Sequence, residues 1–320
     1  MTIDLAATSA SLQRIRDTIA QRVLGQDEVI DQLLAAFVAR GHVLLEGVPG
    51  TAKTLLARML AATVSVRFSR VQFTPDLMPS DVTGVSVYQE ATHRFEFRPG
   101  PIFTDILLAD EINRAPAKTQ AALLEAMQER QVTVDGITHP LGALFTVVAT
   151  QNPVEYEGTY PLPEAQLDRF LMNVRVEYPP REAELGMLAN YAQGFDAERS
   201  ETFMPLPVLS AEDATALRAA SDSITVADEV RAYITDIVRA TRGDTALALG
   251  ASPRAAVALF RVARAAALVT GRDFATPDDV KQHVLPVLRH RVLLAPELQV
   301  EGRTTDDVLT ALLARTPAPQ

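Results

Sequence analysis

A glycine-rich run in the first quarter of the chain has the composition of a phosphate-binding turn. It follows the apolar segment 42–46 and precedes a stretch whose apolar residues have helical spacing. The run nearly fits the pattern G-x-x-x-x-G-K-[ST], in which glycines turn backbone N–H groups toward phosphates and a helix N-terminus adds free donors. Lys53 is expected to reach the β- and γ-phosphates of ATP, and the Thr54 hydroxyl to ligate Mg²⁺. The run consists of Gly47, Val48, Pro49, Gly50, Thr51, Ala52, Lys53 and Thr54.

Two positions in this run are informative. Lys53 is one of only three lysines, with Lys118 and Lys281, in a chain that otherwise uses arginine. Because the rigid fork of arginine does not replace lysine at such a site, a lysine here supports phosphate binding. Ala52 stands where the pattern has its last glycine. Since alanine disfavours positive φ, we expect a helical backbone at Ala52.

Two adjacent carboxylates follow the apolar run 106–109. At the carboxyl end of a buried strand, Asp110 can hold magnesium through water, and Glu111 can polarise the attacking water as a general base. The expected strand that contains the apolar run 147–149 likewise ends on a polar residue, Asn152, which can orient that water. Strand ends at one edge of a parallel sheet converge on a ligand crevice, so these side chains are expected to meet. The alternatives are a solvated carboxylate pair and a turn asparagine.

Two arginines are further candidates for phosphate contact. Arg169 lies near the end of a helix that begins at Pro163. Arg254 lies in the first turn of a helix that begins at Ser252-Pro253, where a cation is unfavourable unless an anion is nearby. A surface ion pair is the alternative for both. Lys118 is assigned either an inter-subunit contact or a solvated helix face.

Composition narrows the class of protein. The 320 residues are 48% hydrophobic and 22% charged, which is typical of a globular protein of about two domains. The absence of cysteine excludes disulfides and thiolate metal sites, and the five histidines show no zinc-ligand pattern. A formal net charge of −10 argues against nucleic acid as a partner. The N-terminus lacks the pattern of a signal peptide and no apolar run has the length of a membrane span, so we expect a cytoplasmic protein.

Hydrophobic periodicity predicts an α/β domain followed by a helical one. Apolar strands alternate with helices up to about residue 180, which implies a parallel sheet covered on both faces. After Pro179-Pro180 the pattern is helical throughout, so we divide the chain into an α/β domain, 1–180, and a helical lid domain, 181–320. Helices are expected at 11–23, at 27–40 and from 116, hairpins at 85–98 and 131–140, and strands at 42–46, 70–73, 105–110, 144–150 and 173–177.

The motifs together resemble those of the AAA+ ATPases, and most closely the MoxR family. The resemblance covers roughly residues 20–300, and the Ala52 departure is itself usual in MoxR-like loops. It is carried by the segments EGVPGTAKT (46–54), DEINRAPAKTQ (110–120), EAMQE (125–129), ATQNP (149–153) and LDRF (167–170).

The resemblance implies a P-loop NTPase (AAA+) fold and hydrolysis of Mg·ATP in a hexameric ring that remodels, assembles or activates other proteins. Asn152 would be sensor 1, Arg169 an arginine finger acting on the next subunit, and Arg254 sensor 2. Gly25 and Gln26, in the segment 23–26, would line the adenine pocket. The two hairpins would be the helix-2 insert and the pre-sensor-1 hairpin. The expected partners are further copies of the chain and a protein with a von Willebrand factor A domain.

Three other functions stay open at this point. One is a nucleotide-dependent switch or scaffold with little turnover, against which Glu111 argues because a switch needs no general base. Another is a nucleic-acid motor, which the net acidity disfavours. The last is the ATPase subunit of a metal-chelatase-like complex, which the run Asn113-Arg114-Ala115-Pro116 disfavours relative to MoxR.

Overall fold

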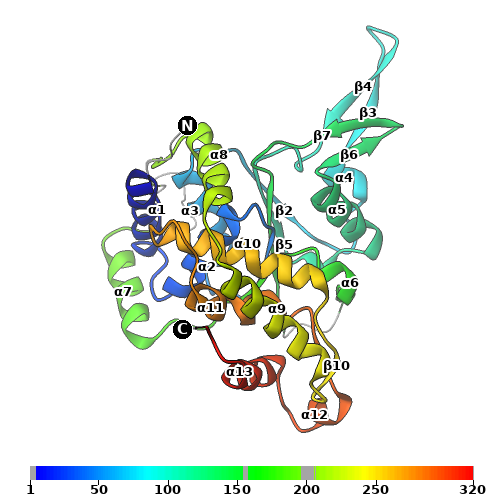
Figure 1. The fold of residues 1–320 in the computed structure, drawn as a ribbon. Coiled ribbons are helices and arrows are strands. Elements are labelled where there is room, and N and C mark those ends of the chain that lie inside the picture. Colours follow the sequence, from blue (N-terminus) through cyan, green and yellow to red (C-terminus); the bar gives the residue numbers. More distant parts are fainter. Residues whose placement is uncertain (1–4, 154–157, 196–204, 206, 320) are drawn as a thin grey trace.

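The computed structural model describes residues 5–153, 158–195, 205 and 207–319, and Figure 1 shows their fold. Five parallel strands form the central sheet: β1 (Val43–Glu46), β2 (Phe68–Gln72), β5 (Ile106–Asp110), β8 (Thr146–Gln151) and β9 (Met172–Arg175). Their order across the sheet is β2-β5-β8-β1-β9. The predicted parallel sheet is thus confirmed, and the carboxyl ends of β5, β8 and β1 lie side by side.

Alternation along the strands divides the sheet's apolar side chains between two clusters. Leu44 and Leu107 belong to one cluster, whereas their neighbours Val43 and Leu108 belong to the other. The first face is covered by α4 (Pro79–Thr83), η1 (Ile112–Arg114) and α5 (Ala117–Glu129). The second face is covered by α1 (Leu5–Ala20), α2 (Asp27–Val38), α3 (Lys53–Thr63) and helices from the C-terminal third of the chain. The sheet is therefore covered on both faces, as predicted.

Two antiparallel hairpins extend from one side of the molecule, in the upper right of Figure 1. They are β3 (Gly84–Gln89) with β4 (Arg94–Pro99), and β6 (Gln131–Val134) with β7 (Ile137–Pro140). In the second hairpin, Asp135 and Gly136 both have positive φ, 50° and 80°, as expected of a two-residue hairpin turn. Phe97 stacks on His139 with ring centroids 4.0 Å apart, so the two hairpins are in contact.

The chain beyond β9 is mainly helical, as predicted. The short helix α6 (Glu164–Leu167) precedes β9. The elements beyond β9 are α7 (Arg181–Ala192), α8 (Ala211–Ala220), η3 (Ser221–Ser223), α9 (Asp228–Gly243), α10 (Pro253–Val269), α11 (Pro277–Leu288), α12 (Pro296–Val300) and α13 (Thr305–Arg315). The sequence did not indicate one feature, a small antiparallel pair formed by β10 (Leu247–Leu249) and β11 (Leu293–Leu294). These segments are too short to show strand periodicity.

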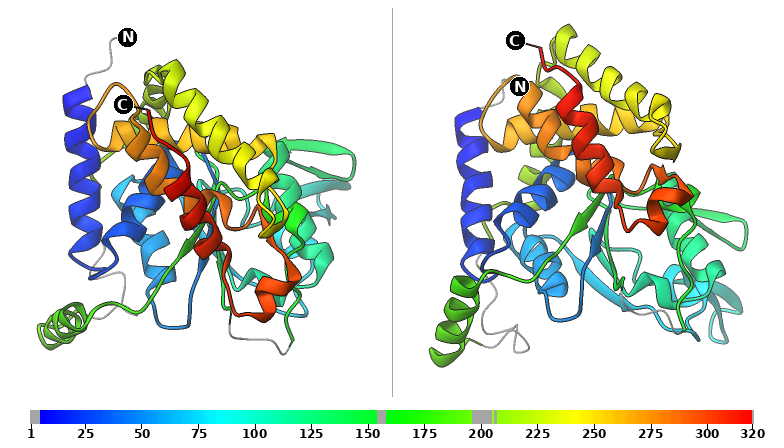
Figure 2. Two further views of the ribbon diagram at one scale, coloured as in Figure 1. Left: turned by 60° about the horizontal axis from the view of Figure 1, so that its bottom comes forward. Right: turned by 90° about the horizontal axis from the view of Figure 1, so that it is seen from below.

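Local capping explains where the C-terminal helices begin. The Ser210 hydroxyl accepts a hydrogen bond from the Asp213 backbone N–H at 3.1 Å, and Thr276 does the same for Asp279 at 3.4 Å. Both helices therefore begin with a capping box. None of the 12 residues of helix α7 is buried, and Figure 2 shows this helix standing apart from the main body. No helix among the described residues has the length and apolar character that crossing a membrane requires.

Candidate functional site

The glycine-rich run forms the turn between β1 and α3, and its two glycines are required for different structural reasons. A Cβ on Gly47 would lie 2.3 Å from the backbone oxygen of Val176, so a side chain has no room there. Gly50 has open space around it, but its φ of 82° is one that other residues rarely adopt. The turn is therefore fixed by close packing at one glycine and by backbone conformation at the other.

Ala52 contradicts the expectation of a helical backbone. Its φ and ψ are 64° and 19°, in the left-handed region, and it is the N-cap of α3. The turn must reverse direction to aim the first N–H groups of α3 into the cavity, and this requires the conformation for which the pattern usually has glycine. Alanine adopts it at a cost of about 1 kcal/mol. No side-chain hydrogen bond caps α3, which leaves its first N–H groups for an anion.

Lys53 is folded back onto its own turn. Its Nζ donates to the carbonyl oxygens of Gly47, at 2.6 Å, and Val48, at 2.7 Å. Burial lowers the pKa of Lys53, while the charges of Asp110 and Glu111 act in the opposite direction. The ammonium group is thus held in the cavity by groups that a phosphate can replace.

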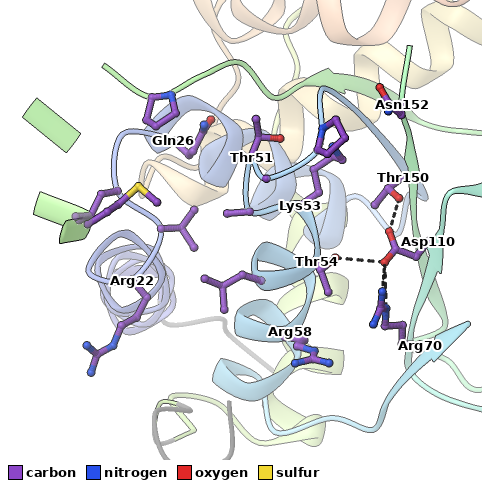
Figure 3. A pocket seen from close by; sticks show the side chains of 18 of the residues that line it. Arg22, Gln26, Thr51, Lys53, Thr54, Arg58, Arg70, Asp110, Thr150 and Asn152 are labelled. Atoms are coloured by element: carbon purple, nitrogen blue, oxygen red, sulfur yellow. Dashed lines mark hydrogen bonds and ion pairs between the residues drawn. The ribbon is translucent and has the colours of Figure 1, made fainter. Parts of the chain in front are cut away.

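Asp110 is the centre of a hydrogen-bond network at the end of β5 (Figure 3). Its Oδ1 accepts from the Thr150 hydroxyl at 2.6 Å. Its Oδ2 lies 3.3 Å from the Thr54 hydroxyl and 2.7 Å from a terminal nitrogen of Arg70. The carboxylate predicted to hold magnesium and the hydroxyl predicted to ligate it are therefore in contact.

Glu111 follows at the mouth of the cavity. It has a positive φ of 55°, and its backbone N–H donates to the Thr150 hydroxyl at 2.8 Å. Its carboxylate accepts from the amide of Gln72 at 2.7 Å and lies 3.2 Å from Nε of Arg114. The strained backbone turns this side chain out of the strand direction, and two neighbours then fix its position.

Asn152 lies at the end of β8, where it is buried and lines the same cavity. Figure 3 shows it on the same side of the turn as Thr150. The structure thus brings together the strand-end residues Asp110, Glu111 and Asn152 with Lys53 and Thr54, as the sequence predicted.

The cavity has a volume of about 640 Å³, within the usual range for small-molecule sites. Six of the eight residues of the turn line it, from Pro49 to Thr54. Its other end is formed by Arg22, Val23 and Gln26 together with residues from α7 and just after it, namely Met187, Asn190, Tyr191 and Phe195. The cavity therefore runs from a phosphate-type turn to a more apolar end.

The segment that joins α1 to α2 forms this apolar end. The Gln26 amide donates to the backbone oxygen of Glu177 at 2.8 Å, which ties the segment to the exit of β9. Gly25 does not line the cavity itself. It packs so closely on the start of α7 that a Cβ would lie 2.7 Å from that of Ala183. Gly25 thus positions α7 against the cavity.

The residues present fit a nucleotide with Mg²⁺. Thr54 and Asp110 supply the oxygen atoms that Mg²⁺ prefers, at one edge of the cavity. No group of three or more metal-ligating side chains occurs in the described part of the chain. A magnesium site here would therefore need the phosphate oxygens of a bound nucleotide, as Mg²⁺ sites on such enzymes usually do.

The two candidate arginines lie elsewhere. Neither Arg169 nor Arg254 lines the cavity. Arg254 forms an ion pair of 3.2 Å with Asp168, the residue before Arg169, so the two arginines adjoin each other. Within the described residues, no hydrogen bond or ion pair engages the side chain of Arg169. For Arg254 the structure thus shows the ion pair that the sequence left as an alternative, and the anion beside it is Asp168.

Sequence reasoning missed several residues of the site. Arg70 and Thr150 both contact Asp110, and Gln72 contacts Glu111. All three lie on β2 or β8, the two strands that flank β5, so the order of the strands in the sheet was needed to place them. Lys118 is exposed on α5, outside the cavity.

Comparison with known proteins supports what the geometry indicates. Residues 42–172 match the family model described as "ATPase family associated with various cellular activities (AAA)", and residues 239–312 match that of the "AAA lid domain". A protein from Cytophaga hutchinsonii that is provisionally named an ATPase has a solved structure with a TM-score of 0.89 and 39% sequence identity. The match covers 99% of this chain and 97% of that one.

Curated relatives narrow the family. The uncharacterised protein YeaC of Bacillus subtilis is 47% identical over 93% of this chain and 91% of its own length. "Chaperone MoxR1" of Mycobacterium tuberculosis is 41% identical over 99% of this chain and 84% of its own length. "Protein MoxR" of Methylorubrum extorquens is 33% identical over 96% of this chain and 94% of its own. Together with the phosphate-type turn and the paired carboxylates at the end of β5, these matches show that the chain belongs to the MoxR family of AAA+ ATPases.

Proposed function

We propose that this protein hydrolyses Mg·ATP at the cavity between β1, β5 and β8. The observation that carries the proposal is the contact between Thr54 and Asp110, 3.3 Å apart, beside the ammonium group of Lys53 and the carboxylate of Glu111. A hydroxyl and an acid for a metal, a cation for phosphates and a second acid for water are the groups that phosphoryl transfer needs. The apolar end of the cavity is the place for the adenine base.

Each side chain has a role that follows from its position. Lys53 leaves the carbonyls of Gly47 and Val48 to bind the β- and γ-phosphates. Mg²⁺, held by Thr54, Asp110 and phosphate oxygens, would supply charge neutralisation at the β–γ bond. Glu111 accepts the proton of the attacking water, and Asn152 orients that water. The turn residues Gly47 to Thr54 donate backbone N–H groups to the phosphates.

Helix α7 forms part of the apolar end of the cavity, where we place the adenine base. Met187, Tyr191 and Phe195 provide apolar surface, and the guanidinium of Arg22 lies 5.3 Å from the ring centroid of Phe195. A helix of 12 residues with no buried side chain has little stability of its own. We expect a bound base to order α7 and thereby to slow amide exchange at 181–192.

The absence of both candidate arginines from the lining of the cavity supports a homo-oligomer. Arg169 and Arg254 lie together at Asp168 and away from the cavity. We propose that both reach the phosphates bound by a neighbouring subunit in a ring, for which a hexamer is the expected size. A trans arginine of this kind contributes about 10³–10⁵ in rate in other nucleotide hydrolases.

The use of the hydrolysis energy is proposed from the family. One relative carries the name "Chaperone MoxR1", and we infer that this chain likewise remodels, assembles or activates partner proteins. A protein with a von Willebrand factor A domain is the expected partner. A pull-down with the Glu111→Gln variant in the presence of ATP tests this, because stalled hydrolysis holds the partner-bound state.

Phosphate release tests the hydrolysis itself. We expect Glu111→Gln to bind ATP and release almost no phosphate, and Lys53→Ala to lose both properties. Glu125→Gln and Lys281→Ala are matched controls, since both residues lie outside the cavity and both variants are expected to keep full activity. Equal phosphate release by wild type and Glu111→Gln would instead favour a nucleotide-dependent switch.

A mixing experiment tests the trans arginine. Arg169→Ala is expected to bind ATP normally and to lose hydrolysis. Glu111→Gln is inactive for a different reason, because its arginine is intact. If Arg169 acts on the next subunit, mixed rings of the two variants recover part of the activity. Absence of recovery in rings shown to be mixed would contradict the trans assignment.

A further inference from the structure

Five arginines gather where the C-terminal helices meet the end of α2, and we call them the arginine cluster: Arg40, Arg130, Arg218, Arg261 and Arg264. Arg40 follows α2, Arg130 follows α5, and the other three lie on α8 and α10. Helix α2 contacts both α8 and α10, so the cluster bridges the sheet-bearing part of the chain and the C-terminal helices (Figure 1). It shares no residue with the ATP cavity.

Part of this positive charge has a structural use. Arg130 donates to the backbone oxygen of Arg40 at 3.0 Å, and Arg261 donates to that of Ala39. These carbonyls belong to the carboxyl end of α2, whose partial negative charge favours nearby cations. The guanidinium of Arg218 lies 4.2 Å from the ring centroid of Phe37, near the end of the same helix.

The negative charge at this junction is smaller than the positive charge. Asp222 forms an ion pair of 2.9 Å with Arg40, and its side chain is 58% exposed. A helix end supplies only about half of one negative charge. Burial, reinforced by Arg130 and Arg40, lowers the pKa of Arg218 to about 9, and Asp105 only partly opposes this. Burial and the same two arginines also lower the pKa of Arg261.

Arg264 differs from the other four members of the arginine cluster in its lack of a polar partner within the part of the chain that the structure describes. Among the described residues, its guanidinium makes no hydrogen bond or ion pair, and its contact is with the ring of Phe260 at 5.4 Å. Its Nε is buried and has no hydrogen-bond partner. A small cavity of about 20 Å³ opens beside it, and its other polar side chains are Arg40, Ser221, Asp222 and Arg261. A cavity of this size admits one water-sized group.

We propose that this cavity is the inner part of a binding site for a tetrahedral oxyanion such as phosphate. One oxygen of the anion enters the cavity beside Arg264, and the others lie at its mouth near Arg40 and Arg261. Three guanidinium groups from two parts of the chain then share one divalent anion, which is the kind of recognition for which arginine is suited. Because the site bridges α2 and α10, its occupation strengthens the junction between the sheet and the C-terminal helices.

The experiment must separate this site from the ATP cavity, which also binds phosphate groups. All measurements therefore use the Lys53→Ala chain as background. Arg264→Gln is the test variant, because Arg264 makes no hydrogen bond whose loss would unfold the chain. Arg239→Gln is the matched control, since Arg239 is an exposed arginine on α9 that lies outside both cavities. Inorganic phosphate and glycerol phosphate are titrated by calorimetry at constant ionic strength.

The Lys53→Ala and Lys53→Ala/Arg239→Gln chains are expected to bind phosphate with equal affinity and to gain thermal stability from it. The Arg264→Gln chain is expected to bind it about tenfold more weakly, the loss that corresponds to one charge-assisted hydrogen bond. Binding of inorganic phosphate identifies a free ion as a ligand. Binding of glycerol phosphate alone identifies a phosphoryl group on a larger molecule. Equal affinity in the Arg264 and Arg239 variants, or no binding of either compound, would overturn the proposal.

Discussion

Asp168 and Arg291 form an ion pair in which Nε of Arg291 lies 2.7 Å from Oδ1 of Asp168. Arg291 is buried, and it also donates to the backbone oxygens of Phe170, at 2.6 Å, and Leu171, at 3.1 Å. The turn that carries Arg169 is thus held on both sides by one arginine that follows α11. Arg254 of α10 pairs with the other oxygen of Asp168. The position of Arg169 therefore depends on the C-terminal helices.

This arrangement predicts that Asp168→Asn impairs hydrolysis without impairing ATP binding. The amide keeps the shape of the carboxylate but loses the charge that Arg254 and Arg291 share. We expect kcat to fall at least about tenfold, with a loss of roughly 1–3 kcal/mol in stability. Steady-state kinetics, ATP binding and thermal unfolding together measure these effects.

Asp306 offers a matched control, because it also bridges two arginines. Its carboxylate lies 2.8 Å from Arg175 and 3.0 Å from Arg289. Asp306→Asn is expected to lose a similar amount of stability and to keep its kcat if the ring assembles. If both variants lost kcat equally, the effect of Asp168 would be one of general stability, and its assignment as a positioning residue would be wrong.

Ala52 allows a test of backbone strain in the phosphate turn. Ala52→Gly relieves the left-handed conformation but adds freedom to the unfolded chain, and the two effects are each about 1 kcal/mol. We therefore expect an unchanged unfolding temperature and unchanged ATP affinity. Ala52→Val places a β-branched residue at positive φ, so we expect a clear loss of stability and of ATP binding. Equal behaviour of the two variants would show that the φ of 64° does not constrain this position.

The difference between Ala52 and its neighbours shows what the sequence could predict. The apolar runs that form β5 and β8 are strong local signals, and each ends on the polar residue that the chemistry needs, so Asp110 and Asn152 could be placed. The left-handed φ of Ala52 depends on how the turn closes over the cavity, which no residue type in the run reveals. Alanine is usual at this position in MoxR-like loops, and the structure shows that Ala52 adopts a left-handed conformation there.

Contacts between residues far apart in the chain could not be predicted from the sequence, for a different reason. Arg70 contacts Asp110 because β2 pairs with β5, and Arg291 contacts Asp168 across 123 positions of sequence. Neither residue belongs to a motif, and arginine is the common basic residue of this chain. Helix α7 was likewise expected only as part of a helical region, because its place beside the ATP cavity follows from close contact with Gly25.

Arg70 predicts an effect on magnesium. Its Nε and a terminal nitrogen lie 3.0 Å and 2.7 Å from the oxygen of Asp110 that also faces Thr54. A guanidinium at this oxygen competes with a divalent cation. We therefore expect Arg70→Gln to reach half-maximal ATP turnover at a several-fold lower Mg²⁺ concentration. Titration of Mg²⁺ at saturating ATP measures this.

Arg67 provides the comparison for Arg70. It also pairs with an aspartate, Asp105, at 3.1 Å, but it lies outside the cavity. Arg67→Gln is expected to leave the Mg²⁺ dependence unchanged. A higher Mg²⁺ requirement in Arg70→Gln would show that Arg70 supports the metal site by holding Asp110 in place, and competition would then be rejected.

Three buried histidines predict a loss of stability in mild acid. Burial, aided by the charge of Arg130, lowers the pKa of His42 to about 3. Burial and the adjacent Arg291 hold the pKa of His290 well below its usual value, and burial also lowers the pKa of His283. In the unfolded chain these groups take up protons near pH 6.5. The unfolded state therefore binds more protons below that pH, and stability falls as the pH decreases.

His42 is the group through which this effect can be measured. Its Nδ1 accepts from the backbone N–H of Val147 at 2.9 Å, and Nε2 lies 3.2 Å from the backbone oxygen of Met127. Between about pH 6 and pH 4, His42 therefore removes up to about 1.4 kcal/mol of stability per pH unit. We expect the unfolding temperature of wild type to fall steadily over this range. His42→Gln, though less stable at pH 7, should show a shallower fall, while His93→Gln, at an exposed hairpin turn, should follow wild type. Identical slopes for His42→Gln and wild type would mean that His42 is not the neutral buried group inferred from its two hydrogen bonds.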